Sequence, residues 1–193
     1  MRVTKEQAQE NRARIVQTAS AQFRERGYDG VGVADLMAAA GFTHGGFYKH
    51  FGSKADLMAE AAACGLSQTA SQVGDVDPVE FVKHYVSRAH RDARESGCTL
   101  AALSGDAARQ PAAIKEVFSS GIENLLATMQ RTGSVFEKLD QREARAKMIN
   151  VFAHAVGALV LSRACPDDSA LADEILEACR TELLAALSLS EAD

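Results

Sequence analysis

Three glycines divide the first 54 residues of the chain into short segments whose apolar residues have helical spacing. The first segment ends at Gly27, a residue type that favours the end of a helix. The second, residues 33–40, ends at Gly41, which can take the positive φ that a reversal of the chain needs. The third, residues 43–51, ends at Gly52. Two short helices joined by a tight turn with glycine are the pattern of a helix-turn-helix.

The rest of the chain predicts only helices. Proline occurs three times, β-branched runs are scarce, and no segment alternates with the period of a strand. We therefore expect an all-α fold of about nine helices, with a three-helix helix-turn-helix domain at 1–54 and a larger helical domain at 55–193. A linker is expected at 71–77. The expected helices cover residues 6–26, 33–40, 43–51, 54–70, 78–95, 98–109, 111–133 and 140–165, and the last begins near 168.

Charge is distributed unevenly along the chain. The net charge is −5, but the first 54 residues hold eight Lys and Arg against five Asp and Glu, a local net charge of +3. A binding surface for DNA is local, so the positive N-terminal segment matters more than the acidic whole. A chance imbalance would give the same numbers.

The chain shows no targeting segment and no metal-binding pattern. Its N-terminus is charged, and its most apolar stretch, residues 151–161, is too short to span a bilayer and is expected to form a buried helix. The four cysteines are widely spread and lack CxxC spacing, which argues against a zinc site or a disulfide framework. We therefore expect a cytoplasmic protein with no metal, no cofactor and no membrane partner.

The predicted helix at 43–51 has an unusual composition. Phe47 and Phe51 lie four residues apart and can anchor one face to the core. Gly45 and Gly46 cost about 1 kcal/mol each in helix stability relative to alanine, a cost that makes sense where the backbone must approach bases or phosphates. Cationic and aromatic side chains remain for the opposite face. A surface helix hairpin without a partner is the alternative.

The segment GYDGVGVADLMAAAGFTHGGFYKHFGSKADLMAEA resembles the DNA-binding region of the TetR (tetracycline-repressor-like) family. The resemblance covers about a quarter of the chain directly, and the family's nine-helix plan fits the expected helices. It rests on Gly27, Ala39, Ala40, Gly41, Gly45, Phe47, Tyr48, Phe51, Ser53, Lys54 and Leu57.

The resemblance implies roles for the residues around this helix. Tyr48 and Lys54 resemble the family's phosphate-contacting pair. Gly46 departs from the Ser, Thr or Ala of many members, and Gly32 replaces a common Ser or Thr cap at a cost of only a few tenths of a kcal/mol. The residues expected to bind DNA are Thr43, His44, Gly45, Gly46, Tyr48, Lys49, His50 and Lys54.

The resemblance also implies a homodimer, a double-stranded operator and a small-molecule effector. Ligand and DNA would favour different tilts of the helix that begins at Lys54, so that each opposes the other's binding. The last two helices are expected to form the dimer interface through two apolar stripes, with an intramolecular core as the alternative. These stripes are Ile149, Phe152, Val156 and Leu159 or Val160, and Ile175, Cys179, Leu183 and Leu187.

An effector pocket is expected among the helices of the larger domain. Cys98 follows Gly97 at a helix start, where a thiolate is favoured, so sensing of electrophiles or oxidants there is a hypothesis. Each of the other residues could also be plain core or surface. The candidates are Phe81, His84, Tyr85, Cys98, Phe118, Met129, Phe152 and His154.

Other classes of function fit less well. His90, Arg91 and Asp92 copy a kinase catalytic-loop tripeptide, but Gly97 stands where that motif needs asparagine, and no glycine-rich phosphate loop accompanies it. We therefore expect no enzyme. The prediction is a repressor in the bacterial cytoplasm, at the nucleoid, that a ligand releases from a palindromic operator. The alternatives are a ligand- or electrophile-sensing activator and a ligand-binding protein without an operator.

Overall fold

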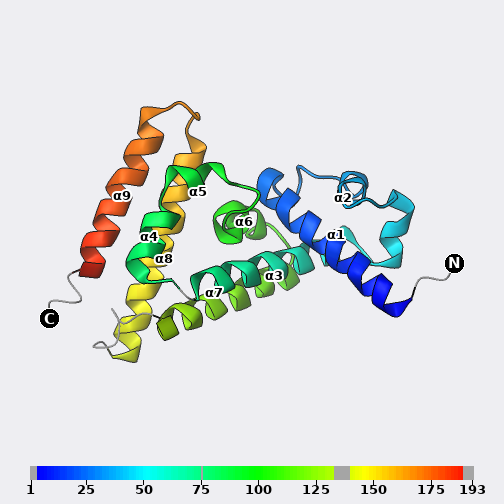
Figure 1. The fold of residues 1–193 in the computed structure, drawn as a ribbon, viewed down its shortest axis with the longest axis horizontal. Helices are drawn as coiled ribbons and strands as arrows, with labels where there is room; N and C mark the ends of the chain where they lie inside the picture. Colours follow the sequence, from blue (N-terminus) through cyan, green and yellow to red (C-terminus); the bar gives the residue numbers. More distant parts are fainter. Residues whose placement is uncertain (1–3, 75, 133–139, 189–193) are drawn as a thin grey trace.

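The computed structural model describes residues 4–74, 76–132 and 140–188, and within these ranges every regular element is a helix (Figure 1). The all-α prediction is therefore confirmed. The elements are α1 (Lys5–Arg26), α2 (Val33–Ala39), a 3₁₀ helix η1 (His44–Lys49), α3 (Lys54–Val73), α4 (Pro78–Tyr85), α5 (Arg88–Asp92), α6 (Thr99–Ala107), α7 (Ala112–Thr132), α8 (Gln141–Ala164) and α9 (Ala170–Ser188).

The N-terminal unit consists of α1, α2 and η1, which lie together at one end of the molecule (Figure 1). Ile15, Phe23 and Leu36 are among its buried residues. Gly27 ends α1 with a φ of 74°, and Gly41 follows α2 with a φ of 82°. Both glycines occupy the left-handed region that other residues adopt only with strain.

The helix α3 begins under the N-terminal unit and continues into the body. Ser53 caps its first turn by accepting a hydrogen bond from the backbone N–H of Asp56. Its outer half packs against α1 and its whole length runs beside α7. A Cβ built on Gly121 of α7 would lie 2.5 Å from Cδ1 of Leu66, so this glycine permits the close approach of the two helices.

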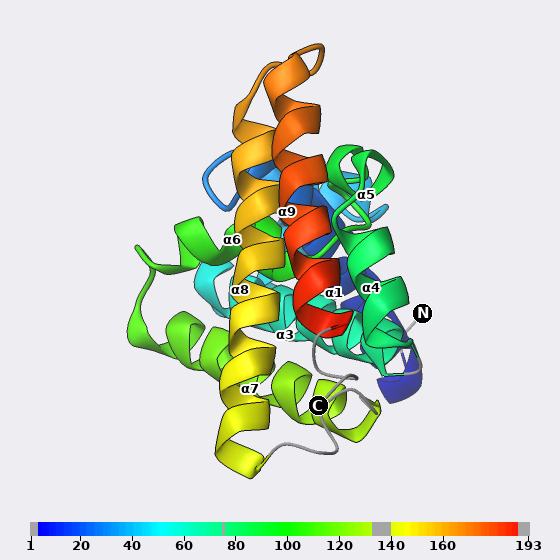
Figure 2. The same ribbon diagram turned by 90° about the vertical axis from the view of Figure 1, so that its left-hand side faces the viewer.

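The helices α8 and α9 form a hairpin on the far side of the body (Figure 2). Asp140 and Glu143 form the predicted capping box at the start of α8. By length and composition alone α8 could span a membrane, a test that core helices of soluble proteins also pass. Here Met148, Val151 and Leu159 are buried inside the protein.

One predicted helix is interrupted. Residues 78–95 form two helices, α4 and α5, because Val86 leaves the helical conformation with φ −91° and ψ 63°. The hydroxyl of Ser87 donates to the carbonyl of His84 and accepts from the backbone N–H of His90, so it caps α5. A serine that bonds to nearby backbone in this way competes with helix continuation. The described chain therefore has ten helices rather than about nine.

Three other boundaries differ from the sequence prediction. The third helix is a 3₁₀ helix, as short helical segments often are. The helix α3 extends to Val73, into the predicted linker. The predicted domain boundary after Lys54 falls in the first turn of α3. The predicted end of the seventh helix at 133 lies outside the described residues.

Candidate nucleic-acid interface and ligand cavity

Two buried phenylalanines hold η1 against the N-terminal unit. Phe47 and Phe51 are almost fully buried, as predicted, and their ring centroids lie 5.5 Å apart. Phe42, in the turn, is partly buried against the same core. This aromatic anchor fixes which face of η1 points outward.

The outward face of η1 carries most of the residues predicted to bind DNA. Thr43, His44 and Lys49 are exposed, and Tyr48 is 72% exposed. Thr43 begins η1 in an extended conformation, and its side chain makes no capping hydrogen bond. These side chains are therefore available to a partner.

The two glycines of η1 are not required by packing within the chain. A Cβ on Gly45 would meet nothing within 4 Å, and one on Gly46 would be in ordinary contact, 3.6 Å from Cε of Met37. The fold does not explain why these positions lack side chains. Close approach of the η1 backbone to a partner would explain it, as the sequence predicts.

The remaining two candidates have roles inside the protein. Lys54 is half-buried, and its Nζ donates to the carbonyl oxygen of Tyr28, 2.5 Å away. The carbonyl oxygen of His50 accepts from the guanidinium of Arg12. Burial, together with the charges of Arg12 and Lys49, lowers the pKa of the His50 imidazole. Contact of His50 and Lys54 with DNA stays a prediction.

Sequence reasoning did not single out Arg12, which ties three elements together. Its guanidinium pairs with Glu60 of α3 and lies 4.3 Å from the ring centroid of Phe51. Arg14 stacks in the same way on Phe42, 4.5 Å from its ring centroid. Both arginines fall on α1 next to η1, but only the folded chain shows which aromatic rings they meet.

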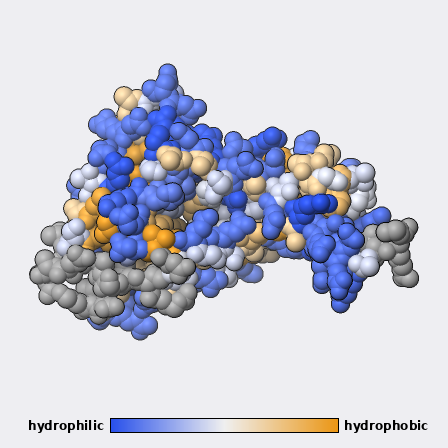
Figure 3. Space-filling view, viewed as in Figure 1, coloured by the Kyte–Doolittle hydropathy of each residue, from blue (hydrophilic) through white to orange (hydrophobic). Residues whose placement is uncertain are grey.

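A cavity of about 550 Å³ lies between the end of α3, α4, α5 and residues 96–98. Figure 3 shows hydrophobic side chains on this face of the body, in the region that α4 occupies in Figure 1. Four of the eight predicted ligand residues line the cavity: Phe81, His84, Tyr85 and Cys98.

The structure does not bring the other four candidates to this cavity. Phe118 and Met129 are buried in the core. Phe152 is buried with its ring centroid 6.2 Å from that of Tyr85, and it lines a separate small apolar groove on α8. His154 is exposed on α8. A role for these four in ligand binding has no support from their positions.

The polar groups of the cavity are mostly neutral. Among the described residues, no hydrogen-bond partner lies within reach of the buried Tyr85 hydroxyl, and burial, together with the neighbouring Cys98, raises the pKa of Tyr85 well above its usual value. Cys98 precedes the first residue of α6, but it is only 4% exposed. Reactive cysteines are at least partly exposed, so the position of Cys98 weakens the electrophile hypothesis.

His90 is a cavity residue whose role the sequence did not reveal. Its Nδ1 lies 2.8 Å from the carbonyl oxygen of Tyr85, and its Nε2 accepts from the backbone N–H of Cys98 at 3.2 Å. A neutral imidazole with its proton on Nδ1 satisfies both bonds. Burial lowers the pKa of His90, which keeps it in that form. His90 therefore connects the end of α4 to the start of α6.

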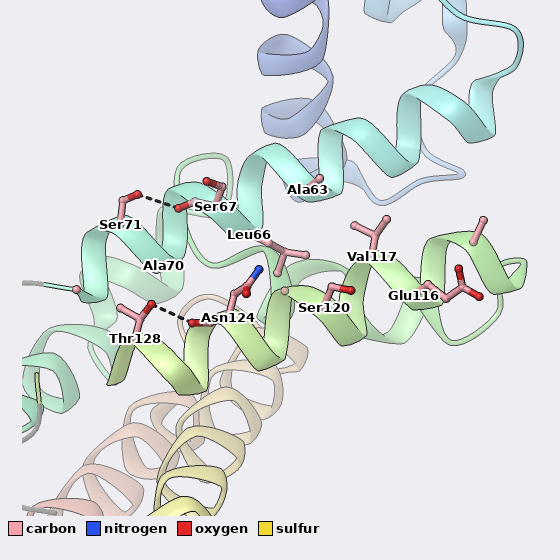
Figure 4. A pocket seen from close by; sticks show the side chains of 13 residues that line it. Ala63, Leu66, Ser67, Ala70, Ser71, Glu116, Val117, Ser120, Asn124 and Thr128 are labelled. Carbon is pink, nitrogen blue, oxygen red and sulfur yellow. Dashed lines mark hydrogen bonds between the residues drawn. The ribbon is translucent and has the colours of Figure 1, made fainter. Parts of the chain in front are cut away.

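A second hollow, of about 750 Å³, lies between α3 and α7 (Figure 4). None of the predicted ligand residues lines it. Leu66 of α3 and Asn124 of α7 point toward one another across it, and small or hydroxyl side chains such as Ser67 and Ser120 surround them. The run of small residues along α3 was the available signal for a groove here.

Hydrogen bonds of Tyr28 and Arg24 join the N-terminal unit to the body. The backbone N–H of Tyr28 donates to Oδ2 of Asp106 on α6, at 3.1 Å. The Nε of Arg24 donates to the carbonyl oxygen of Glu95, at 2.7 Å. Residues 96–98, which follow Glu95, line the cavity. The cavity wall is thus connected to α1 through one residue.

The fold and the site define an all-helical protein that presents a helix-turn-helix segment at one end of a larger helical body. Residues 15–61 match the family model described as "Bacterial regulatory proteins, tetR family". The HTH-type transcriptional regulator TtgR of Pseudomonas putida is 45% identical over 58 residues, which are 30% of this chain and 28% of TtgR. The N-terminal part of the chain is thus similar to the DNA-binding region of tetR-family regulators, and the matched segment spans less than a third of TtgR.

Solved structures of similar fold cover nearly the whole chain. Reduced NemR of E. coli has a TM-score of 0.70 at 16% identity and covers 90% of this chain and 95% of NemR. AibR, solved with isovaleryl coenzyme A and operator DNA, has a TM-score of 0.54 at 18% identity and covers 90% of this chain and 98% of AibR. These likenesses show the fold of the body as well as that of the N-terminal unit.

The burial of His90 predicts that the protein loses stability in mild acid. A histidine in the unfolded chain has a pKa of about 6.5, and the pKa of His90 in the folded protein is lower. As pH falls below about 6.5, the unfolded state therefore takes up the proton first, and the free energy of unfolding decreases until the pH reaches the folded pKa. Denaturant unfolding between pH 7.5 and 5 should show this loss, with His50 contributing in the same direction.

The variant His90→Asn should be less stable at pH 7 and should have a flatter pH dependence than the wild type. His154→Gln, which removes an exposed imidazole, is the control and should keep the wild-type slope. Equal slopes for wild type and His90→Asn would show that His90 is not the acid-sensitive group.

Proposed function

We propose that the chain is a sequence-specific DNA-binding transcriptional regulator, a homodimeric repressor that a small ligand releases from a palindromic operator. The observation that carries the proposal is the outward face of η1. Its polar and aromatic side chains are exposed, while Phe47 and Phe51 beneath them are buried. Because the aligned part of TtgR is only 28% of that regulator, the likeness supports the DNA-binding end most strongly.

The chemistry of this face suits the major groove and its phosphates. Lys49 supplies a cation, and His44 and Tyr48 supply hydrogen-bonding groups at the edge of an aromatic surface. The net charge of +3 over residues 1–54 gives the same end of an acidic protein its attraction for DNA. We propose residues 1–54 as the DNA-binding domain and 55–193 as the ligand-binding and dimerisation domain, acting in the bacterial cytoplasm at the nucleoid.

Selection from a random duplex library should enrich an inverted repeat. Tyr48→Ala and Lys49→Gln should bind the selected duplex at least about tenfold more weakly than the wild type. Lys49→Gln should also reduce the slope of log affinity against log salt by about 2 if Lys49 of each protomer contacts a phosphate. Both variants should unfold like the wild type, because both side chains are exposed.

Lys83→Gln, on the body helix α4, is the matched control and should keep the wild-type affinity and salt slope. Absence of any enriched duplex, with and without candidate ligands, would favour the alternative of a ligand-binding protein without an operator. Enrichment only in the presence of a ligand would favour a ligand-sensing activator or a co-repressed regulator.

The outer face of α8 supports the proposed homodimer. Ile149 and Val160 are each 43% exposed and Leu161 is 59% exposed, although all three are large and apolar. Figure 2 shows that α8 and α9 together form one side of the molecule. A second copy related by a two-fold axis would cover this side and make a four-helix bundle.

The predicted α9 stripe contributes less to this surface than expected. Leu183 and Leu187 are buried within the protomer, while Ile175 and Cys179 are only half-buried. On α8, Phe152 and Leu159 likewise belong to the core of the protomer. The proposed interface therefore rests mainly on α8.

Ile149→Glu should dissociate the dimer, because it places a charge in an apolar face that has no partner for it. Sedimentation equilibrium should give a dimer for the wild type and a monomer, or a much weaker dimer, for the variant. Ala13→Glu, an exposed change on α1, is the control and should remain dimeric. A monomeric wild type, or a fully dimeric Ile149→Glu, would exclude this interface.

The cavity beside α4 is the proposed ligand site. It is lined mostly by apolar and neutral groups, which suits an uncharged or weakly polar effector. A ligand that displaces residues 96–98 would act on Arg24, and through it on α1. The neighbour AibR, solved with a ligand and operator DNA, provides a family precedent for one chain that binds both.

Filling the cavity should separate ligand response from DNA binding. Ala89→Phe places a ring in the cavity from α5 and should abolish release by any compound that displaces the wild type from its selected duplex. Its affinity for DNA without ligand should stay within about threefold of the wild type. Ala127→Phe on α7, which does not line the cavity, is the control. Unchanged release of Ala89→Phe would place the effector elsewhere, with the groove between α3 and α7 as the next candidate.

A further inference from the structure

Three arginines from separate elements line one small pocket where the N-terminal unit meets the body. Arg24 comes from α1, Arg94 follows α5, and Arg163 lies in the last turn of α8. The pocket has a volume of about 300 Å³, and Ala101 and Ala102 of α6 form part of its lining. Figure 1 shows the end of α1 beside α6, with α5 and the end of α8 on the other side.

The hydrogen bonds of the two more buried arginines leave their charges without an acidic partner. Arg24 is 9% exposed and donates to the hydroxyl of Ser20 at 2.8 Å as well as to the carbonyl oxygen of Glu95. Arg163 donates to the carbonyl oxygens of His90 and Arg91, each at 2.9 Å. All these acceptors are neutral oxygens, and each guanidinium keeps further N–H donors.

The third arginine, Arg94, differs from the other two in its contacts. Within the described parts of the chain, the half-buried side chain of Arg94 makes no hydrogen bond or ion pair. By contrast, the nearby Arg88 and Arg91 both pair with Asp92. The arginines of the pocket are therefore distinguished by the lack of carboxylate partners.

The cations outnumber the acids around the pocket. Glu25 is the one acidic residue in its lining, and the charge of Glu95 acts on Arg24 from nearby. Burial lowers the pKa of Arg163; the charges of Arg94 and Arg91 also lower it, while Tyr85 and Cys98 act in the opposite direction. Three cations thus line one small space, an arrangement that an anion would stabilise.

We propose that this pocket binds a small oxyanion of the phosphate or carboxylate type, held by the guanidinium groups of Arg24, Arg94 and Arg163. Arginine donors match both anions in geometry. The site is distinct from the cavity proposed for the effector, and the inference does not depend on the proposed function. A bound anion would connect α1 to the segment after α5 and to α8, and would brace the junction between the N-terminal unit and the body.

DNA phosphate is not the expected occupant. Arg12 and Arg14 contact the aromatic residues on either side of η1, and Arg24 lies ten residues further along α1 than Arg14. At 1.5 Å per residue, this separation is about 15 Å along the helix. The pocket also includes Val160 of α8, one of the exposed apolar residues of the face proposed for the dimer.

Thermal unfolding and titration calorimetry of the full chain, without DNA, test the proposal. The probes are inorganic phosphate and sodium acetate, each compared with sodium chloride at equal ionic strength and pH 7.5. Phosphate, acetate or both should raise the melting temperature more than chloride does and give a saturable heat of binding. The anion that does so assigns the class of ligand.

Arg94→Gln should weaken this binding at least about tenfold, because it removes a charged donor. It should leave the anion-free melting temperature close to that of the wild type, since Arg94 has no partner in the fold. Glu25→Gln should strengthen binding by removing the one acid in the lining. Arg142→Gln, at an exposed position in the first turn of α8, is the matched control and should bind like the wild type.

The proposal is overturned if neither anion stabilises the protein beyond the chloride control, or if Arg94→Gln and Arg142→Gln bind with equal affinity. Because the measurement contains no DNA and no effector, either result leaves the proposed regulator function unaffected. Loss of operator binding would in turn leave the anion site in place.

Discussion

The packing of Phe47 and Phe51 under η1 is the contact on which the proposed DNA-binding end of the molecule depends. A helix of six residues has too few internal hydrogen bonds to hold itself together, so its conformation comes from this anchor. Arg12 strengthens it from the other side by joining His50, Phe51 and α3. The backbone of η1 therefore sets the direction of the outward-pointing side chains, although none of them makes a side-chain hydrogen bond to the described residues.

Hydrogen bonds help to hold the N-terminal unit against the body. Such a small unit buries little apolar surface and relies on its neighbours for stability. Lys54, Tyr28 and Asp106 form one connection, in which the backbone of Tyr28 both accepts from Lys54 and donates to Asp106. Arg24 and the segment after α5 form a second. Both involve the C-terminal end of α1 or the residues just after it, and neither involves the exposed side chains of η1.

Local sequence patterns predicted those features that depend on single residues and their neighbours in the chain. Gly27 and Gly41 have the positive φ that their places demand, Ser53 caps α3, and Asp140 with Glu143 caps α8. The break after α4 was not predicted, because it has neither proline nor glycine and depends on the hydroxyl of Ser87. A serine in a helical stretch more often just points to solvent, so its type alone does not mark a break.

The residues of the candidate site likewise fall into those that local sequence predicts and those that only the folded chain reveals. The exposed row on η1 follows from helical spacing once Phe47 and Phe51 are assigned to the core. The roles of Arg12, Lys54 and His90 depend on partners about 10 to 50 residues away in the chain, and residue type gives no information about which partner is met. For the cavity, composition selected the aromatic residues of α4 correctly. It could not separate them from Phe118 and Met129, which have the same chemistry but pack in the core.

The contact between Leu66 and Gly121 has a mechanical consequence. It brings α3 and α7 so close that a turning α3 would use this point as its fulcrum. From Leu66 the helix extends twelve residues, about 18 Å, to Lys54 and seven residues, about 10 Å, to Val73 at the cavity. If α3 is rigid, a shift of 1 Å at Val73 would therefore move Lys54, at the other end of the helix, by roughly 1.7 Å in the opposite direction. In a symmetric dimer the two ends move together, so the separation of the two reading heads would change by up to about twice that amount, against a half-site spacing of about 34 Å.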